Sequence, residues 1–406
     1  MTPKEANIRS EFPLLREKIY GKYMTDLDNG ATTQKPRCVL QCIEEIYEHY
    51  NSNIHRGVHY LSNKCTDLFE QARHTIAEHL NAREDAEVIF TRGTTEAINL
   101  LAYSFGETFC KEGDEIIVSE MEHHANIVPW QMLCERKRMT LRVIPITDNG
   151  ELVMESVEPM ISERTRLIAV THVSNVMGTI NDVERIIKIA HSHNVPVLVD
   201  GAQSMPHVRI DVQAMDCDFL AFSGHKMYAP NGSGALYGKR EYLDKMVPYH
   251  GGGEMIDHVS FKGTTYNVIP FKFEAGTPDY VSAIALAEAI RFMESLDMDY
   301  IMAHEQALVQ YALHRMRSLE GMRIIGDAKY RSGAISFLVG KIHHYDMGMI
   351  LDKMGIAVRT GHHCAQPLME RMGITGTVRA SFGVYNTEED VEALIKGIMK
   401  ATAMLG

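Results

Sequence analysis

The chain has 406 residues, 45% of them hydrophobic and 23% charged, which is ordinary for a soluble globular protein and excludes a disordered one. A formal net charge of −12 argues against a nucleic-acid surface as the main function, because phosphate binding requires clustered lysine and arginine. The chain has no apolar run of about 18 residues or more, its N-terminus is charged, and its cysteines are spread singly, so we expect a cytoplasmic protein.

From about residue 65 to residue 240, short apolar runs alternate with longer stretches of helical periodicity. Amphipathic stretches such as residues 182–194 lie between most of the runs. Continuous β-branched runs separated by helices predict a buried, largely parallel sheet that is covered on both faces. The predicted strands are at 86–90, 114–119, 141–146, 166–173, 196–200, 218–223 and 234–238.

Turns rich in glycine and threonine cluster between residues 230 and 280. Beyond them the chain mixes helical and strand patterns, which predicts a second, smaller α+β domain. The predicted helices are at 281–296, 298–318, 346–354 and 387–403, and the predicted strands are at 333–339 and 377–382.

Lys226 lies in the segment SGHKMY, after the predicted strand 218–223 and before a Pro/Gly turn. Its amine is therefore expected at the edge of an open α/β sheet where ligands bind. A buried lysine can have a lowered pKa, and its neutral amine can form a Schiff base. An arbitrary lysine is far more often solvated, but the adjacent Ser223 and His225 suit a phosphate and a Schiff base.

Asp200 ends the strand 196–200, and Gln203 follows three residues later. A carboxylate there can pair with the protonated pyridine nitrogen of pyridoxal phosphate, and Gln203 can reach the phenolic oxygen of the same ring. A helix N-cap is about as common a reason for an aspartate after a strand. Asp200 and Lys226 at neighbouring strand ends together favour the cofactor.

The segment RGTTEAINL (92–100) opens a helix after a strand, with Gly93, Thr94 and Thr95 at the start. Free backbone N–H groups and two hydroxyls at a helix start can hold a phosphate. The signal is weak by itself, because Thr-Thr-Glu is also a good capping sequence.

Two histidine pairs suggest metal binding at first sight. His123 and His124 follow a strand end, where an imidazole can stack on a planar cofactor ring and shuttle protons. RTGHHCAQP (359–367) places Cys364 behind the second pair, where a cysteine can be a metal ligand, a nucleophile or a turn residue. No HxxxH or HExxH pattern and no carboxylate-rich ligand set is present, so metal is the minor interpretation.

The segments THVSNVMGT, VLVDGAQ, FSGHKMYAPNGSGALY, FEAGTPD and RTGHHCAQP resemble, in order and spacing, the cysteine desulfurases of the aminotransferase class V group. Within that group the chain is similar to the class II branch typified by the SufS proteins of iron–sulfur cluster assembly. The resemblance covers nearly the whole chain from residue 28 onward. Its most specific markers are the SGHK motif and the short RxGHHCAxP loop, since class I relatives carry their cysteine in a longer, Ser-rich loop.

The resemblance implies an α/β architecture, the fold type I of transferases that depend on pyridoxal phosphate. It implies a large cofactor-binding domain at residues 24–294, with a mostly parallel mixed sheet covered by helices. Residues 1–23 together with 295–406 would form a smaller α+β domain that carries the Cys364 loop.

The resemblance also implies roles for individual residues. Lys226 would hold pyridoxal 5'-phosphate covalently and move the Cα proton, Cys364 would be the nucleophile, and His123 would stack on the ring. The other cofactor contacts would be Thr94, Thr95, Asp200, Gln203, Ser223 and His225, with Thr277 reaching in from the other subunit of a homodimer. The substrate contacts would be Asn175, Arg379, Arg359 and His55. His250 stands where some relatives are expected to carry an acidic residue.

The implied reaction converts L-cysteine to L-alanine and leaves a persulfide on Cys364. Arg359, His362 and His363 are expected to make the surroundings of Cys364 electropositive and so favour its thiolate. The sulfur would pass to a shuttle protein of the SufE or SufU type, with no nucleic acid or membrane involved. Selenocysteine lyase or cysteine sulfinate desulfinase activity on the same scaffold stays open; an aminotransferase would not need Cys364, and a silent scaffold would not need Lys226, Asp200 and His123.

Overall fold

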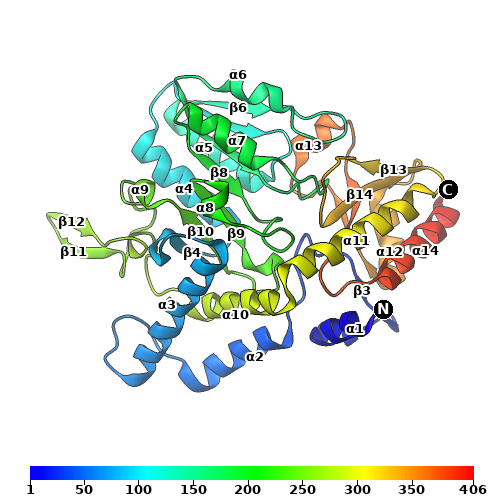
Figure 1. The fold of residues 1–406 in the computed structure, drawn as a ribbon, viewed down its shortest axis with the longest axis horizontal. Helices are drawn as coiled ribbons and strands as arrows, with labels where there is room; N and C mark the ends of the chain where they lie inside the picture. Colours follow the sequence, from blue (N-terminus) through cyan, green and yellow to red (C-terminus); the bar gives the residue numbers. More distant parts are fainter.

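The structure, a computed structural model, describes residues 1–406. Its larger part is built on a seven-stranded sheet of order β4-β10-β9-β8-β7-β5-β6 (Figure 1). Only β10 runs antiparallel to its neighbours, so the predicted, largely parallel sheet is confirmed. The strands are β4 (Val88–Thr91), β5 (Glu115–Ser119), β6 (Thr140–Ile144), β7 (Thr165–Thr171), β8 (Val197–Asp200), β9 (Phe219–Ser223) and β10 (Gly234–Gly238).

Both faces of this sheet are buried, because successive side chains of a strand point to opposite sides. In β5, Ile116 and Val118 enter one hydrophobic core and Ile117 enters the other. The first core is closed by α4 (Thr94–Phe109) and α5 (Val128–Lys137), and the second by α3 (Tyr60–Leu80), α7 (Val183–Ser192) and α10 (Tyr280–Leu296). The helices on both faces therefore confirm the predicted layers.

Helix α7 shows how the periodicity produces this packing. Its buried residues Val183, Ile186, Ile187 and Ala190 recur at helical spacing and form one apolar stripe. Asp182 caps the helix by accepting a hydrogen bond from the backbone N–H of Arg185. The predicted helix at 182–194 is thus confirmed.

The remaining elements of the larger part lie around this sandwich. Helix α2 (Arg37–Glu45) packs on α10, and the short helices are α6 (Val157–Met160), α8 (Val212–Met215) and α9 (Arg240–Leu243). A hairpin of β11 (Ile256–Ser260) and β12 (Gly263–Tyr266) projects from the body (Figure 1). The sequence patterns indicated only turns for this stretch.

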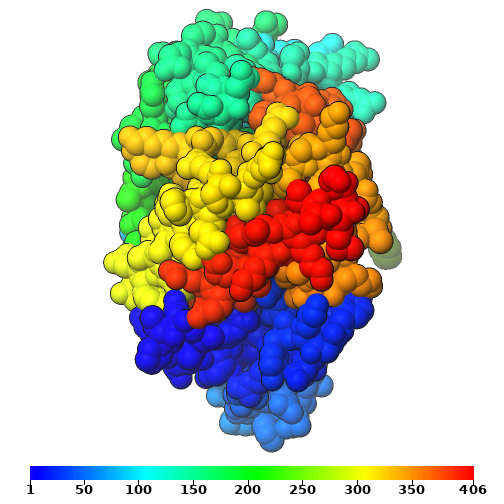
Figure 2. Space-filling model, turned by 90° about the vertical axis from the view of Figure 1, so that its right-hand side faces the viewer, coloured from blue at the N-terminus to red at the C-terminus, as the bar shows by residue number.

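The smaller part is an antiparallel sheet of order β13-β14-β17-β16 packed against helices. Its strands are β13 (Met322–Ile325), β14 (Ala334–Val339), β16 (Arg359–Gly361) and β17 (Thr377–Ser381). The helices are α11 (Met298–Arg317), α12 (His344–Lys353) and α14 (Glu388–Leu405). Figure 2 shows α14, in red, lying across the outer side of this part. A separate core of β14, β17, α11, α12 and α14 confirms the predicted α+β character.

The N-terminal residues contact both parts of the molecule. In α1 (Pro3–Ser10), Arg9 forms an ion pair with Asp390 of α14, whereas Ile8 belongs to the second core of the large sheet, the one that Ile117 enters. β3 (Thr25–Asp26) pairs with β15 (Ile356–Ala357) of the smaller part, next to strands β1 (Lys18–Ile19) and β2 (Lys22–Tyr23). The domain division at residues 24 and 294 therefore stays a prediction.

None of the helices combines the length with the apolar composition that a membrane span requires.

Candidate active site

A cavity of about 240 Å³ lies at the carboxyl-terminal edge of the large sheet, against the smaller part. Strands β7, β8 and β9 end at its wall with Thr171, Asp200 and Ser223. All the predicted site residues except Thr277 and His55 line it: Thr94, Thr95, His123, Asn175, Asp200, Gln203, Ser223, His225, Lys226, Arg359, Cys364 and Arg379. The common edge of the parallel strands explains this convergence of distant residues.

Lys226 lies in the turn that follows β9, and its amine has no hydrogen-bond acceptor in the protein. Desolvation lowers the pKa of this amine to about 8, although the nearby Asp200 carboxylate opposes the shift. The positive charges of Arg379 and Arg359 lower the pKa further. A substantial fraction of the amine is therefore neutral near pH 8, as attack on a carbonyl requires.

Asp200 is the last residue of β8 and is buried. Its Oδ1 accepts a hydrogen bond from the Ala202 N–H at 2.9 Å, while Oδ2 has no donor in the protein. Burial raises the pKa of this carboxyl, and the hydrogen bond and Lys226 oppose the shift. Nearby, the Gln203 side-chain amide donates to the Gly30 carbonyl at 2.8 Å. A buried carboxylate with a free oxygen matches a protonated ring nitrogen.

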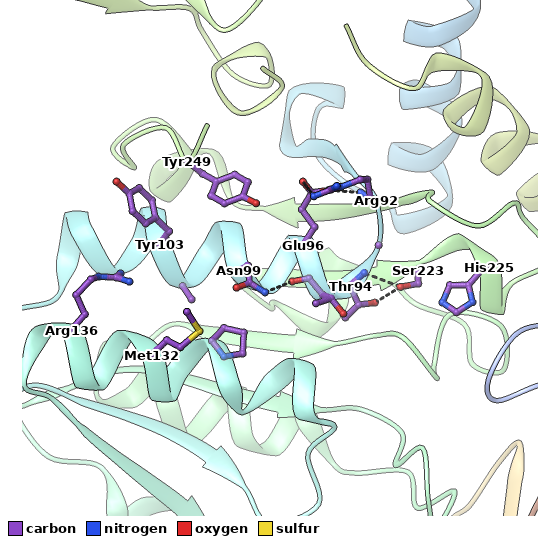
Figure 3. A pocket seen from close by; sticks show the side chains of 14 residues that line it. Arg92, Thr94, Glu96, Asn99, Tyr103, Met132, Arg136, Ser223, His225 and Tyr249 are labelled. Carbon is purple, nitrogen blue, oxygen red and sulfur yellow. Dashed lines mark hydrogen bonds and ion pairs between the residues drawn. The ribbon is translucent and has the colours of Figure 1, made fainter. Parts of the chain in front are cut away.

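The start of α4 forms an anion cradle beside these groups (Figure 3). The Thr94 N–H donates to Ser223 Oγ at 2.8 Å, and the two hydroxyls lie 2.8 Å apart. Gly93, the N-cap, offers no side chain, and the next N–H groups of the helix, those of Thr95 and Glu96, have no acceptor in the protein. Burial lowers the pKa of the adjacent His225 to about 4, which leaves this imidazole neutral.

These three features fit pyridoxal 5'-phosphate. Lys226 offers an amine for the aldehyde, the unpaired oxygen of Asp200 suits the pyridinium, and the cradle at Thr94 suits the phosphate. Nowhere in the structure do three or more histidine, cysteine or carboxylate side chains lie close enough together to hold a metal ion.

His123 lines the cavity as a neutral imidazole. Its Nδ1 accepts a hydrogen bond from the Ala125 N–H at 3.0 Å, so the proton of the ring resides on Nε2. Desolvation, followed by the charge of Lys226, lowers its pKa to about 3.

Two arginines of the smaller part face each other across a strand pair. Arg359 of β16 and Arg379 of β17 are direct partners in the register, and both line the cavity. Like charges in this arrangement destabilise a sheet, so the pair suits an anion bound between them. Arg379 is buried, and its Nε has no acceptor. Its Nη2 lies 3.3 Å from Asp28, which sequence reasoning did not find.

Burial lowers the pKa of Arg379 to about 10, although the Asp28 carboxylate opposes this. The guanidinium stays charged at neutral pH and retains donors for a carboxylate. Asn175, the other predicted carboxylate contact, is already engaged: its backbone carbonyl accepts from Arg379 at 2.7 Å, and its amide donates to the His363 carbonyl at 2.7 Å.

The Cys364 loop has a constrained backbone. Gly361, His363 and Cys364 have φ values of +109°, +52° and +54°. A non-glycine residue in this left-handed region costs about 1–2 kcal/mol, so neighbouring contacts must hold the loop. The chain then forms α13 (Gln366–Arg371), which packs into the second core of the large sheet, the one that Ile117 enters.

The expectation that both histidines of the loop supply positive charge was wrong for His363. This residue is buried, and desolvation together with Arg379 and Arg359 lowers its pKa to about 2. Its Nε2 lies 2.8 Å from the Thr377 hydroxyl. The cationic groups at the cavity are therefore Arg359, Arg379 and protonated Lys226.

Thr277 and His55 lie outside this cavity in their own chain. Thr277 lines a separate cavity of about 380 Å³, together with His250. His55 packs against Phe271, and its Nε2 lies 3.1 Å from Glu70. Their roles at a shared site stay predictions.

A third cavity, of about 630 Å³, opens beside the cradle along α4 (Figure 3). It shares Thr94, Thr95, Ser223 and His225 with the first cavity, so the two cavities adjoin at the cradle. Tyr103 and Met132 on its wall are largely exposed, with 41% and 54% of their surfaces accessible.

The fold and the lysine site define an α/β enzyme of the class that uses pyridoxal phosphate. The Aminotransferase class-V family matches residues 25–394, and the chain belongs to this family.

Three similar proteins share one described activity, that of a cysteine desulfurase. A probable cysteine desulfurase of Halalkalibacterium halodurans is 49% identical over 399 residues, covering 98% of each chain. The crystal structure of the cysteine desulfurase CsdA from Escherichia coli superposes with a TM-score of 0.92, at 38% identity and 100% coverage of both chains. The apo structure of a cysteine desulfurase from Thermococcus onnurineus superposes with a TM-score of 0.94 at 38% identity, covering 100% of this chain and 99% of that one.

Proposed function

We propose that this protein is a cysteine desulfurase that converts L-cysteine to L-alanine and retains the sulfur as a persulfide on Cys364. The observation that carries the proposal is that the Cys364 loop and Lys226 line one cavity of about 240 Å³, together with two arginines suited to a carboxylate. The cysteine desulfurase relatives support the same reaction.

Each end of the cavity has a task in this reaction. Lys226, Asp200 and the cradle at Thr94 would hold pyridoxal phosphate, which would supply an electron sink for the substrate Cα. Arg379 and Arg359 bind the substrate carboxylate, and Lys226 Nζ takes the proton from Cα and returns it.

Sulfur transfer then takes place at Cys364. Its thiolate attacks the substrate sulfur, so that an S–S bond forms while the C–S bond of the substrate breaks. The electron pair of the broken bond stays with the substrate carbon skeleton, which gains a proton at Cβ and leaves as alanine. The balance is L-cysteine plus enzyme thiol giving L-alanine plus enzyme persulfide, so the reaction needs no external oxidant.

We further infer that the enzyme is a homodimer whose sites are shared between subunits. The support is that Thr277 lines a different cavity of its own chain, while a 630 Å³ cavity with exposed Tyr103 and Met132 opens beside the cradle. A second subunit seated there would cover apolar side chains and complete the site.

The persulfide requires an acceptor, and we propose a shuttle protein of the SufE or SufU type that serves iron–sulfur cluster assembly in the cytoplasm. The support is the shortness of the loop 359–367, which keeps Cys364 next to the cavity so that a partner must collect the sulfur. The seven unpaired cysteines suit a reducing compartment.

Mass spectrometry tests the proposed function directly. After incubation with L-cysteine, the peptide that carries Cys364 should gain the mass of one sulfur, and alanine should appear in equal amount. Cys364→Ala should keep the visible absorbance of the bound cofactor but form no persulfide. Turnover of L-cysteine by Cys364→Ala at the wild-type rate would contradict the proposal, and strong activity on L-selenocysteine alone would favour a selenocysteine lyase.

A further inference from the structure

The cavity does not explain why His123 is followed by a second histidine. His124 does not line the cavity, yet its backbone and side chain both reach the loop that carries Cys364. The contact between His124 and Gln366 joins residues 242 positions apart in the chain, so sequence patterns did not show it.

Two hydrogen bonds connect His124 to the loop. The His124 N–H donates to the Cys364 carbonyl at 2.7 Å. The Gln366 N–H donates to His124 Nε2 at 3.0 Å. An imidazole nitrogen that accepts a hydrogen bond carries no proton, so the ring must be neutral with its proton on Nδ1. Burial and the neighbouring His362 lower the pKa of His124, which favours this state.

The second bond completes a helix that begins immediately after the nucleophile. Gln366 is the first residue of α13, and the N-cap, Ala365, supplies no side-chain hydrogen bond. The first N–H groups of a helix have no partner within the helix, and a capping acceptor satisfies them. His124 therefore supplies from a distant turn the cap that Ala365 lacks.

The loop needs such support because His363 and Cys364 have left-handed backbone conformations. The Cys364 N–H donates to His362 Nδ1 at 3.2 Å, and the His362 ring lies 5.7 Å from the His124 ring. Strained conformations persist where surrounding contacts over-determine them. The two imidazoles hold the backbone on both sides of Cys364.

The turn that carries His124 is itself anchored in the large sheet. The buried Glu122 accepts hydrogen bonds from the Thr171 N–H at 2.9 Å and from the Asn126 amide at 2.7 Å. The Trp130 indole in turn donates to Asn126 at 2.8 Å. One rigid turn therefore presents His123 to the cofactor cavity and His124 to the nucleophile loop.

We propose that His124 is a positioning residue that holds Cys364 in place for attack on the substrate sulfur. The inference rests on the proposed function, because it assigns Cys364 as the nucleophile. His124 acts through the backbone of residues 364 and 366 and does not itself contact the reacting atoms.

The test compares His124→Ala with His124→Gln, whose Oε1 can replace Nε2 as the acceptor. His124→Ala should form persulfide on Cys364 about tenfold more slowly or worse, because misplacing a reacting group by about 1 Å can cost about a hundredfold in rate. The loss should fall on kcat and leave KM and the visible absorbance of the cofactor unchanged. His124→Gln should restore the rate to within about threefold, since the accepting atom is kept.

A second measurement follows the loop without turnover. Alkylation of Cys364 by iodoacetamide in the holoenzyme should be several-fold faster in His124→Ala than in wild type, and His124→Gln should restore the slow rate. His314→Ala is the matched control: it removes an exposed histidine of α11, and both rates should stay at the wild-type values.

Two outcomes would overturn the proposal. One is a His124→Ala variant with wild-type rates of persulfide formation and alkylation, and the other is a His124→Gln variant as impaired as His124→Ala. If the wild-type protein formed no persulfide at all, the proposed function would fail. The alkylation rates would then still show whether His124 holds the loop.

Discussion

At the scale of single residues, the site places cationic side chains in a buried, desolvated cavity. Desolvation lowers the pKa of Lys226 to about 8 and that of Arg379 to about 10. The acidic groups at this place are Asp200 and Asp28, which only partly offset these charges. Buried charge is costly without partners, so the cavity is poised for anionic ligands such as a phosphate and a carboxylate.

The lowered pKa of Lys226 predicts how cofactor attachment depends on pH. Only the neutral amine attacks an aldehyde, and its fraction rises as the pH passes through the folded-state pKa. Uptake of pyridoxal phosphate by the apoprotein, followed by visible absorbance, should therefore rise steeply between about pH 7 and pH 9. A rise that began only near pH 10 would show that Lys226 is not desolvated.

The place of Arg379 on the cavity wall predicts that replacing its guanidinium weakens substrate binding. Arg379→Lys keeps the charge but loses the planar fork of the guanidinium that matches a carboxylate, so KM for L-cysteine should rise about tenfold or more. Steady-state alanine production measures this, with the exposed Arg317→Lys as the control. An unchanged KM would remove Arg379 from substrate binding.

At the scale of elements, the first turn of α4 works because Gly93 precedes it. Its φ of +137° is strained for any other residue, and an added Cβ would lie 2.8 Å from Ser223 Oγ. Glycine therefore lets the cradle hydroxyls of Thr94 and Ser223 approach each other while the N–H groups of Thr95 and Glu96 stay free.

Gly93→Ala should weaken cofactor binding about tenfold or more, because the new methyl displaces a hydroxyl of the cradle. Equilibrium titration of the apoprotein with pyridoxal phosphate measures the change. Gly113→Ala is the matched control, since its φ of +85° is also positive but an added Cβ meets nothing within 4 Å. Equal effects of the two substitutions would assign the loss to backbone strain alone.

At the scale of the whole molecule, the site lies where its two parts meet. Asp200 ends a strand of the large sheet and Lys226 lies in the turn after another, whereas Arg359 and Arg379 lie in strands of the small sheet. The N-terminal stretch joins the parts: the Asn29 side chain donates to the Ser381 carbonyl at 2.8 Å, and the Thr33 N–H donates to the His225 carbonyl at 3.0 Å. Small displacements between the parts would therefore change the distance between the lysine and the arginines that we propose to bind the substrate carboxylate.

Mixed dimers test whether Thr277 completes the site of the partner subunit. Lys226→Ala and Thr277→Ala should each be strongly impaired. Re-associated in equal amounts, they should recover about a quarter of the wild-type activity, because about half of the dimers are mixed and each holds one intact site.

The control for this experiment mixes Lys226→Ala with Cys364→Ala. Both residues line the same cavity of one chain, so no mixed dimer would hold an intact site. Absence of recovery in verified dimers of Lys226→Ala with Thr277→Ala would instead indicate that each chain holds a complete site.

Much of this architecture was predictable because it follows from local patterns. The apolar runs marked all seven strands of the large sheet, and Asp200 and Ser223 were placed correctly because parallel strands end at a common edge. The hairpin of β11 and β12 was missed because its residues are exposed and carry no apolar alternation. Strand β16 was missed because a strand of three residues is too short to show a periodic pattern.

The sequence by itself determined which chemical groups the chain carries and where they follow the predicted strands. These are the hydroxyl of Thr94, the carboxylate of Asp200, the amine of Lys226 and the thiol of Cys364. Tertiary structure alone decided how these groups behave. It sets Arg359 opposite Arg379, leaves His363 neutral and brings the imidazole of His124 to the backbone of Gln366. The physical reason is that burial and hydrogen bonding depend on neighbours far apart in the chain, which no local spacing encodes.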